Sequence, residues 1–399
     1  MKTKTILAMA GAILLSASIP AQAADGQFRA FIDTLWPQAQ AAKIKRNTFE
    51  RAFAGVGEPD PLVLKMASNQ PEFTSTTSQY LLKAVTPARI ETGQGMLVTQ
   101  ARLLSALEKK HGVDRHILLA IWGMESNFGQ DKGSMAVMRS LATLAYHGAR
   151  SKYAKPQIIA ALKILQSGVV RPESFVGSWA GAMGHTQFIP TSYLAFAVDW
   201  TGDGVRDIWG SEADALASTA NYLAKSGWSS TRPWGWEVIL PDNFDRALIG
   251  RAHPRRIAEW KKLGVTAANR NFTDAATKAF IIVPQGLNGP AFLVTQNFNA
   301  IMAYNESHSY AIAVGHLADR IRGQSPIQTA WPDQNIELSF AERVEMQKRL
   351  IGHGFATGGT DGRFGARTYE AILAFQKKRR LTLDGEPTRA LLIELRKGS

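Results

Sequence analysis

Cysteine is absent from all 399 residues of the sequence. Disulfide bonds are therefore excluded, so the fold depends on its hydrophobic core even in an oxidising compartment. A lipid attached to cysteine is excluded too, which removes one kind of membrane anchor. Residues of the AVILMFWYC set make up 45% of the chain. A chain of this length and composition is expected to form two or three units around large cores.

Long apolar runs are also missing, apart from one near the N-terminus. Residues 6–19 form an apolar stretch that follows the basic start Met1–Thr5 and precedes the small residues Ala21–Ala23. This pattern predicts a secretory signal peptide, residues 1–23, cleaved after Ala23. A membrane-spanning helix is the alternative, but the stretch is short for one. We therefore expect a soluble periplasmic protein with no membrane-spanning segment after cleavage.

Acidic residues are outnumbered, with 33 Asp and Glu against 46 Lys and Arg and a formal net charge of +13. Loss of Lys2 and Lys4 with the signal peptide would leave about +11. Such an excess predicts an anionic partner. Nucleic acid is disfavoured, because an exported chain has little access to it and no nucleic-acid-binding motif is present. Basic clusters such as Lys377–Arg380 can equally be ordinary solvated surface.

One carboxylate stands out because it ends an apolar run that has no other use for a charge. Glu125 lies in the segment Ile121–Gly129, and leucine and isoleucine recur upstream of it at helical spacing. The pattern predicts that Glu125 lies near the C-terminal end of a mostly buried helix. Desolvation there would favour the protonated acid, which can donate a proton near neutral pH. A glutamate that caps the helix or forms a salt bridge is the alternative.

A second segment, Gly177–Tyr193, is rich in glycine and alanine. Backbone of this kind can approach a ligand closely, and Ser178 and Gln187 supply neutral hydrogen-bonding groups. A Glu-Ser-Asn-Phe-Gly run at Glu125, followed by Gly-Ala-Met-Gly and Gln-Phe-Ile-Pro in this segment, closely resembles the lytic murein transglycosylases of the membrane-bound transglycosylase B type. The resemblance covers about residues 29–322. The missing cysteine departs from the lipoprotein members of that family.

The resemblance implies a lysozyme-like helical catalytic domain in which Glu125 is the only catalytic carboxylate and Ser178 and Gln187 bind substrate. It also implies that further residues line a glycan groove: Arg150, Tyr153, Tyr80, Tyr222, Tyr304, Asn305 and Tyr310. The family often has two adjacent arginines where this chain has one. Taken singly, each tyrosine can equally be a half-buried core or interface residue.

The loop Asp199–Asp207 resembles a calcium-binding EF-hand loop, with oxygen ligands at alternating positions and a glycine for the sharp turn. Its twelfth position is Gly210 in place of the usual bidentate Glu, so Glu212 or Asp214 would have to complete the shell. The family resemblance favours Asp214. The expected ligands are Asp199, Thr201, Asp203, the Val205 carbonyl and Asp214, for Ca²⁺ or Na⁺. A turn without metal is the alternative, and no organic cofactor is expected.

The chain changes character after Arg322. Residues 323–337 contain turn formers and little periodicity, which predicts a linker. Residues 338–399 resemble a three-helix peptidoglycan-binding domain. Short strands at Trp234–Leu240 and Phe292–Val294 predict a β-containing subdomain at about residues 232–296, inserted in the catalytic domain at 24–322. The predicted fold class is mainly α (α+β), with a lysozyme-like domain, a small β-containing subdomain and a C-terminal three-helix module.

The resemblance implies cleavage of the β-1,4 bond between N-acetylmuramic acid and N-acetylglucosamine, with formation of a 1,6-anhydromuramic acid end, during cell-wall turnover. Peptidoglycan carries carboxylates, so it fits both the charge and the expected compartment. We expect a monomer that acts on glycan strands, with other cell-wall enzymes as further candidate partners. Two alternatives stay open from the residues alone: a lysozyme-type hydrolase that uses Asp131 or another second acid, and a catalytically silent wall-binding scaffold.

Overall fold

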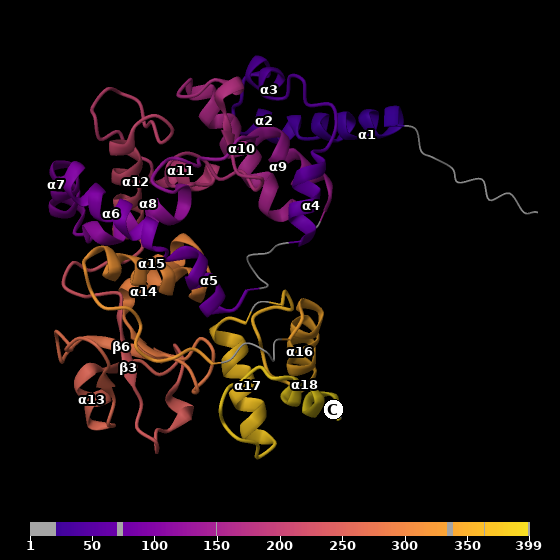
Figure 1. Ribbon diagram of the computed structural model, residues 1–399. Coiled ribbons are helices and arrows are strands. Elements are labelled where there is room, and N and C mark those ends of the chain that lie inside the picture. The colour runs from indigo at the N-terminus through magenta and orange to yellow at the C-terminus, as the bar shows by residue number, and fades with distance from the viewer. Residues whose placement is uncertain (1–20, 70–74, 149, 333–337, 363, 398–399) are drawn as a thin grey trace, which may run out of the picture.

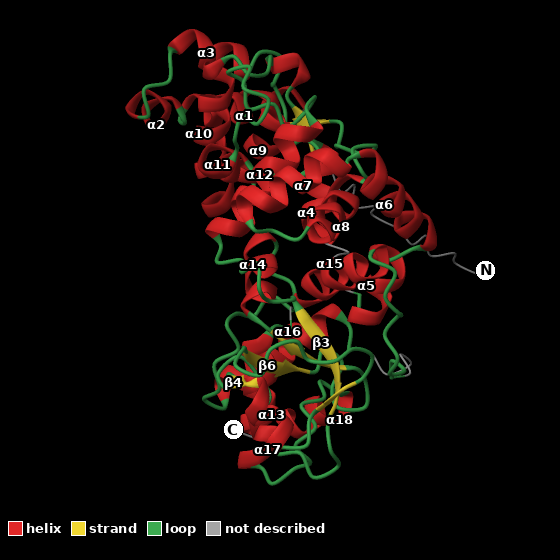
Figure 2. Ribbon diagram, turned by 90° about the vertical axis from the view of Figure 1, so that its left-hand side faces the viewer, coloured by secondary structure: helices red, strands yellow, loops and turns green. Residues whose placement is uncertain are grey.

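The computed structural model describes residues 21–69, 75–148, 150–332, 338–362 and 364–397. Most of the predicted signal peptide and residues 333–337 of the predicted linker lie outside these ranges. The described chain forms a helical upper part and a lower part in which a sheet lies beside a small helical module (Figures 1 and 2). No helix of the described residues is long and apolar enough to cross a membrane.

One hydrophobic core lies within the helical upper part, and Phe28, Phe49, Leu141 and Ile158 are among its members. The elements around it are α1 (Ala21–Asp33), α2 (Trp36–Ala41), α3 (Arg46–Ala52), α4 (Pro61–Asn69), α9 (Val137–Tyr146), α10 (Ser151–Ser167) and α11 (Pro190–Phe196). Two short strands, β1 (Met135–Ala136) and β2 (Val176–Gly177), pair with each other, and the 3-10 turn Pro172–Ser174 comes just before β2. They connect this part of the fold to the glycine-rich segment Gly177–Tyr193.

A second core surrounds helix α8 (Arg115–Ser126), whose residues from Ile117 to Gly123 are all buried. The helix begins where the Asp114 side chain accepts a hydrogen bond from the His116 amide at 2.8 Å. Its neighbours are α5 (Thr77–Ala84), α6 (Pro87–Thr99), α7 (Ala101–His111), α12 (Glu212–Lys225), α14 (Gln296–Tyr304) and α15 (His308–Ile321). The buried helix predicted around Glu125 is therefore confirmed.

The lower part contains an antiparallel sheet with strand order β4-β6-β7-β3-β5. The strands are β3 (Gly235–Ile239), β4 (Arg255–Arg256), β5 (Thr266–Ala267), β6 (Lys278–Ile282) and β7 (Ala291–Val294), accompanied by the 3-10 turn Arg246–Leu248 and helix α13 (Ile257–Lys262). Both predicted strand segments form strands, whereas β6 was missed although its run from Ala279 to Val283 is apolar throughout.

Alternate residues of the sheet face different cores, as expected for a period of two. Trp234 and Phe280 pack with the α8 core, whereas Trp236 and Ile281 pack with α13. Both tryptophans are at most 5% exposed, so packing explains them. Trp234 also fixes the sheet to α15, because its indole donates to Asp319 at 2.9 Å.

The predicted linker begins as an ordered segment on the sheet. The buried carboxylate of Glu237 in β3 accepts the backbone amides of Gln328 at 2.9 Å and of Thr329 at 2.7 Å. Ile327 and Trp331 pack against the α8 core. This part of the segment is therefore anchored to the sheet that precedes the module.

The C-terminal module contains α16 (Phe340–Gly352), α17 (Ala366–Lys378) and α18 (Arg389–Arg396) around a small apolar core. Two buried glutamines organise its turns in the same way. Gln347 Oε1 accepts the Gly362 amide at 2.7 Å, and Gln376 Oε1 accepts the Gly385 amide at 2.9 Å. Each Asp-Gly pair is thus tied to a helix. The predicted fold class, mainly α with a small sheet, is confirmed.

Candidate active site

Helix α8 ends immediately after Glu125, at a sharp reversal of the backbone. Asn127 and Phe128 have φ values of 49° and 59°, and Gly129 has a φ of 85°. The Phe128 amide donates to the Trp122 carbonyl at 3.2 Å, which closes the helix end. Two consecutive non-glycine residues in the left-handed region are uncommon and cost free energy. The reversal leaves Glu125 half-buried while the preceding turns are fully buried.

Two glycines of the first motif are explained by close packing. A Cβ atom on Gly123 would lie 2.7 Å from Cζ of Phe128. One on Gly129 would lie 2.4 Å from Nδ1 of His185 and would also require a left-handed backbone. A side chain at either position would therefore displace an aromatic ring that the helix end needs.

Contacts between the two motifs hold the helix end in place. The Ser126 hydroxyl donates to the His185 carbonyl at 2.5 Å, and the Trp122 indole donates to His185 Nδ1 at 3.2 Å. Burial lowers the pKa of His185 to about 4, and the nearby charge of Lys132 adds to this effect. His185 is therefore neutral at physiological pH, and Nδ1 can accept a hydrogen bond. These contacts give His185 a positioning role beneath the helix end.

Tyr310 of α15 contacts Glu125 directly. Its hydroxyl donates to Glu125 Oε1 at 2.5 Å, and its side chain is only 3% exposed. Burial raises the pKa of Tyr310 well above its ordinary value, and the charge of Glu125 raises it further. The hydroxyl therefore keeps its proton and remains a donor. The sequence suggested Tyr310 only as a residue of the groove.

Tyr222 and Tyr304 form one aromatic group with Phe188. Their ring centroids lie 5.0 Å apart, and each is 5.8 Å from the ring of Phe188. The Tyr304 hydroxyl donates to the Thr186 carbonyl and the Tyr222 hydroxyl to the Ala303 carbonyl, both at 2.5 Å. Burial and then the charge of Glu125 raise the pKa of Tyr304 well above its ordinary value. The structure thus places Tyr304 near Glu125, with its hydroxyl engaged by the backbone.

Two further groove candidates, Tyr80 and Asn305, lie beside this group. Tyr80 of α5 is half-buried and interacts electrostatically with Tyr310. Asn305 is exposed at the C-terminal end of α14, immediately after Tyr304. Helices α5, α8, α14 and α15 therefore bring Tyr80, Tyr304, Asn305 and Tyr310 to the same region as Glu125.

Ser178 and Gln187 lie at the two ends of a compact turn. Ser178 Oγ accepts the Ala182 amide at 3.0 Å, so its own proton can go to a ligand. Gln187 has a φ of 50°, and its Nε2 donates to the carbonyls of Lys132 at 3.1 Å and Gly184 at 3.0 Å. These bonds fix the amide nitrogen and leave the Gln187 side-chain carbonyl as the acceptor for a ligand.

Arg150 and Tyr153 support the same turn from α10. The Tyr153 hydroxyl donates to the Ala180 carbonyl at 2.9 Å, and the Arg150 guanidinium lies 5.0 Å from the ring centre of Trp179. Burial raises the pKa of Tyr153 to about 12, so its hydroxyl stays protonated. Both contacts are to the turn that carries Ser178, which gives Arg150 and Tyr153 a positioning role.

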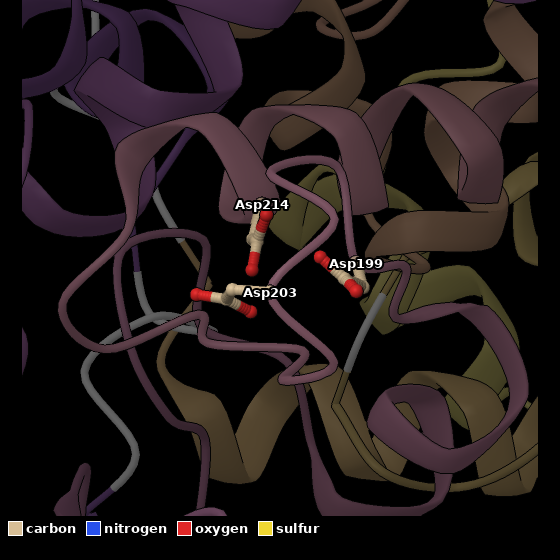
Figure 3. Close-up of side chains that lie close together, drawn as sticks. All are labelled: Asp199, Asp203 and Asp214. Carbon is tan, nitrogen blue, oxygen red and sulfur yellow. The ribbon is translucent and has the colours of Figure 1, made fainter.

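The Asp-rich loop brings three carboxylates together. One oxygen from each of Asp199, Asp203 and Asp214 lies within 4.8 Å of the others, and Figure 3 shows the three side chains close together. Asp214 is fully buried in the first turn of α12. Hard oxygen donors in this number suit Ca²⁺ better than a transition metal.

The other expected ligands, Thr201 and Val205, are not carboxylates of this cluster. The Thr201 hydroxyl donates to Asp199 Oδ1 at 3.2 Å, and Val205 lies in the loop between Asp203 and Asp214. Asp207, at the ninth position, accepts the amides of Trp209 and Gly210 and does not belong to the group. Glu212, the less favoured candidate for the position of Asp214, accepts a hydrogen bond from Gln100 Nε2 at 2.6 Å. The donor set fits a calcium ion held chiefly by the three aspartates.

Asp131, the second acid of the hydrolase alternative, is exposed. Its Oδ1 accepts the Gly133 amide at 3.2 Å, and its own amide donates to the Ser126 carbonyl at 2.9 Å. These contacts give Asp131 a structural explanation within the turn that follows Gly129.

The candidate site places a half-buried glutamate at the end of a buried helix, in contact with a buried tyrosine, and this arrangement suits the proton donor of a glycan-cleaving enzyme. Residues 27–319 match the family model of the transglycosylase SLT domain, and residues 341–395 match that of a peptidoglycan binding domain. The chain therefore belongs to the transglycosylase SLT domain family and is a lytic transglycosylase, as the motifs predicted.

Individual relatives agree with this assignment. The chain is 27% identical over 271 residues to membrane-bound lytic murein transglycosylase B of Escherichia coli (strain K12), covering 65% of this chain and 73% of that protein. SltB3 from Pseudomonas aeruginosa, solved with NAG-anhNAM-pentapeptide, is 47% identical with a TM-score of 0.85 and covers 93% of this chain and 99% of its own. The Escherichia coli lytic transglycosylase SLT35, solved with calcium, is 25% identical with a TM-score of 0.61, covering 74% and 92%.

Proposed function

We propose that this enzyme cleaves the β-1,4 bond between N-acetylmuramic acid and N-acetylglucosamine in peptidoglycan and leaves a 1,6-anhydromuramic acid end. The contact between Tyr310 and Glu125 carries this proposal, because it presents one oriented carboxyl group to the substrate region. The complex of SltB3 with NAG-anhNAM-pentapeptide supports it, since that relative binds a fragment with such an anhydro end.

Glu125 supplies both proton transfers. In its protonated form it donates to the glycosidic oxygen, and the bond from that oxygen to C1 of the muramic acid breaks. The positive charge that develops at C1 is met by the acetamido oxygen of the same sugar. The Glu125 carboxylate then takes the proton from the C6 hydroxyl while the C6 oxygen forms its bond to C1. The proton is returned to Glu125 and no water is consumed.

The other site residues position the substrate and the acid. Ser178 donates its free proton to the acetamido group, and the Gln187 carbonyl accepts from a sugar hydroxyl. Tyr310 orients Glu125 and stabilises its anionic form between the two proton transfers, because a donor to a carboxylate favours the ionised state. Tyr80, Tyr304 and Asn305 line the groove, while Arg150, Tyr153 and Tyr222 support its walls. Positioning contacts of this kind act by aligning the reacting groups.

Calcium has a structural role in this proposal. Asp199, Asp203 and Asp214 would hold the ion, which would neutralise three converging carboxylates and stiffen the loop before α12. The complex of SLT35 with calcium supports the assignment. The C-terminal module binds the wall, the exported chain acts in the periplasm, and tethering raises the local concentration of enzyme on an insoluble polymer.

Mass spectrometry of muropeptides released from purified sacculi tests the proposal. The wild type should release products that are lighter than reducing-end muropeptides by one water, and Glu125→Gln should lower their yield by about 10²–10⁴-fold. Reducing-end products would instead establish a hydrolase. Unchanged yield from Glu125→Gln, with binding to sacculi retained, would refute Glu125 as the acid.

A further inference from the structure

A cavity of about 720 Å³ lies between the C-terminal module and the catalytic domain. Its volume is within the range of sites that hold small ligands or short peptides. In Figure 1 the module lies beside the sheet and below α5, and Figure 2 also shows the module next to the sheet. Residues from both domains line the cavity, including Thr77, Arg251, Gln285, Glu306, Arg367 and Glu386.

The module is docked against the sheet in a way that keeps this cavity formed. The Tyr369 hydroxyl of α17 donates to the Pro284 carbonyl, after β6, at 2.8 Å. Glu386 packs closely on the backbone of Gly286, where a Cβ atom would collide with its carboxylate. Leu373 packs against the sheet core. A turn that follows β6, helix α17 and the loop before α18 therefore form fixed walls.

Charged groups of both signs line the cavity. Arg251 comes from the sheet region and Arg367 from α17, and among the described residues neither forms an ion pair. Glu306 of the catalytic domain is exposed, and it too forms no ion pair with another described residue. Guanidinium groups bind carboxylates through paired hydrogen bonds, whereas a carboxylate binds an ammonium. The lining thus complements a short peptide that carries carboxylates and an amine.

The cavity adjoins the active site through the loop between α14 and α15. Glu306, Ser307, His308 and Ser309 line the cavity, and the next residue is Tyr310, which contacts Glu125. The Ser309 and Thr77 hydroxyls are hydrogen-bonded at 2.8 Å, which fixes this loop to α5. An extended peptide of five residues spans at most roughly 17 Å. A peptide attached to a sugar near Glu125 can therefore reach a cavity wall that begins one residue from Tyr310.

We propose that this cavity is a second substrate site, which binds the carboxylate- and amine-bearing peptide that hangs from the glycan strand. Arg251 and Arg367 bind peptide carboxylates, and Glu306 faces the amine. The module would then take part in choosing the glycan that is cut, besides holding the enzyme on the wall. The proposal rests on the proposed function for the cleavage step, but peptide binding can be measured without cleavage.

Cleavage of matched glycan strands with and without peptides tests the consequence for specificity. The wild type should cleave peptide-bearing strands at least ~10-fold faster in kcat/KM than strands stripped by an amidase, which corresponds to one good ionic contact. Arg251→Glu and Arg367→Glu should bring this ratio close to one. Lys348→Glu, a charge reversal at an exposed lysine of the same module, should keep it. Equal ratios in all four proteins would overturn the proposal.

Calorimetric titration of the intact protein with the free stem peptide gives a readout that does not depend on catalysis. The wild type and Lys348→Glu should bind the peptide, and the two arginine variants should bind at least ~10-fold more weakly. Arg251→Ala and Arg367→Ala, which only remove the charge, should show a smaller loss. Absence of binding to the wild type, or equal binding by all variants, would refute the site even if anhydro products are formed. Peptide binding without anhydro products would instead refute the proposed reaction alone.

Discussion

Tyr310 and Glu125 are separated by 185 positions in the chain, and their side chains meet at 2.5 Å. The two residues come from α15 and α8, which pack side by side in the core of the catalytic domain. The contact joins a buried donor to a half-buried carboxyl group. The proposed proton donor is thus oriented by a helix that is distant in the sequence.

Tyr310→Phe should keep the fold and lose this hydrogen bond. A hydrogen bond to a charged group is worth about 1.5–3 kcal/mol, so we expect kcat to fall by roughly 10–100-fold. The anionic form of Glu125 also loses its donor, so activity should persist to higher pH on the limb where the acid ionises. Steady-state kinetics across a pH series would measure both effects.

Tyr193→Phe is the matched control for this substitution. The Tyr193 hydroxyl also donates one hydrogen bond, but to the backbone carbonyl of Arg206 at 2.7 Å, and its side chain is 1% exposed. This variant should lose a similar amount of stability but keep its pH profile. If both variants lose kcat equally with unchanged profiles, Tyr310 is structural and has no positioning role.

Gly129→Ala should destabilise the protein more than an alanine at another left-handed glycine. The new methyl group would collide with His185, which is held by Trp122. Gly55→Ala, at a φ of 75° with no atom within 4 Å, carries only the backbone cost. We expect the Gly129 variant to have the lower melting temperature. Its free energy of unfolding should fall by about 1–3 kcal/mol more than that of the Gly55 variant, which is the cost of overpacking. Equal melting temperatures would argue against the proposed packing.

Calcium should raise the melting temperature of the wild type. At a free concentration of about 100 times Kd, ligand linkage adds about 2.7 kcal/mol to the stability. Asp214→Asn should abolish the calcium-dependent rise, because Asp214 is the buried member of the cluster. Calorimetric unfolding in the presence of calcium, sodium or a chelator would measure this rise in melting temperature.

Asp207→Asn serves as the control for the calcium experiment. Its carboxylate caps the Trp209 and Gly210 amides and lies outside the cluster. The variant should be less stable overall yet keep the calcium-dependent rise. A rise that survives Asp214→Asn and disappears with Asp207→Asn would contradict the assigned ligand set.

Glu386 should make the domain contact sensitive to pH. Burial, and then the charge of Asp384, raise the pKa of Glu386 to about 7 from an ordinary value of 4.5. Its Oε1 is buried and accepts no hydrogen bond from the described residues. The folded state therefore holds a proton that the unfolded state has released, so stability is lost as pH rises from about 4.5 through about 7.

Glu386→Gln should remove this loss. We expect the variant to be more stable than the wild type at pH 8 by about 1 kcal/mol, the lower end of the cost of an unsatisfied buried group, and to match it near pH 5. Glu394→Gln, at an exposed ion pair with Lys397 on α18, should follow the wild-type profile. Melting curves of the three proteins at both pH values would decide; parallel profiles for wild type and Glu386→Gln would contradict the pH effect.

The local features of this protein could be predicted from its residues alone. An apolar run ending in a glutamate predicted a buried helix with Glu125 at its end, and α8 confirms it. The alternating Asp and Gly of residues 199–207 predicted a tight loop with converging oxygens, and the ordered motifs identified the family. These features could be predicted because helix periodicity and turn chemistry depend on residues close together in the chain.

The contacts that these local features make could not be predicted in this way, because they depend on tertiary packing. The hydrogen bond from Tyr310 to Glu125 and the contact of the neutral His185 with Trp122 each join residues that are distant along the chain. The docking of the module and its cavity arise where Tyr369 meets Pro284. Such contacts follow from how the cores pack, and packing depends on the whole fold; no short stretch of sequence specifies it.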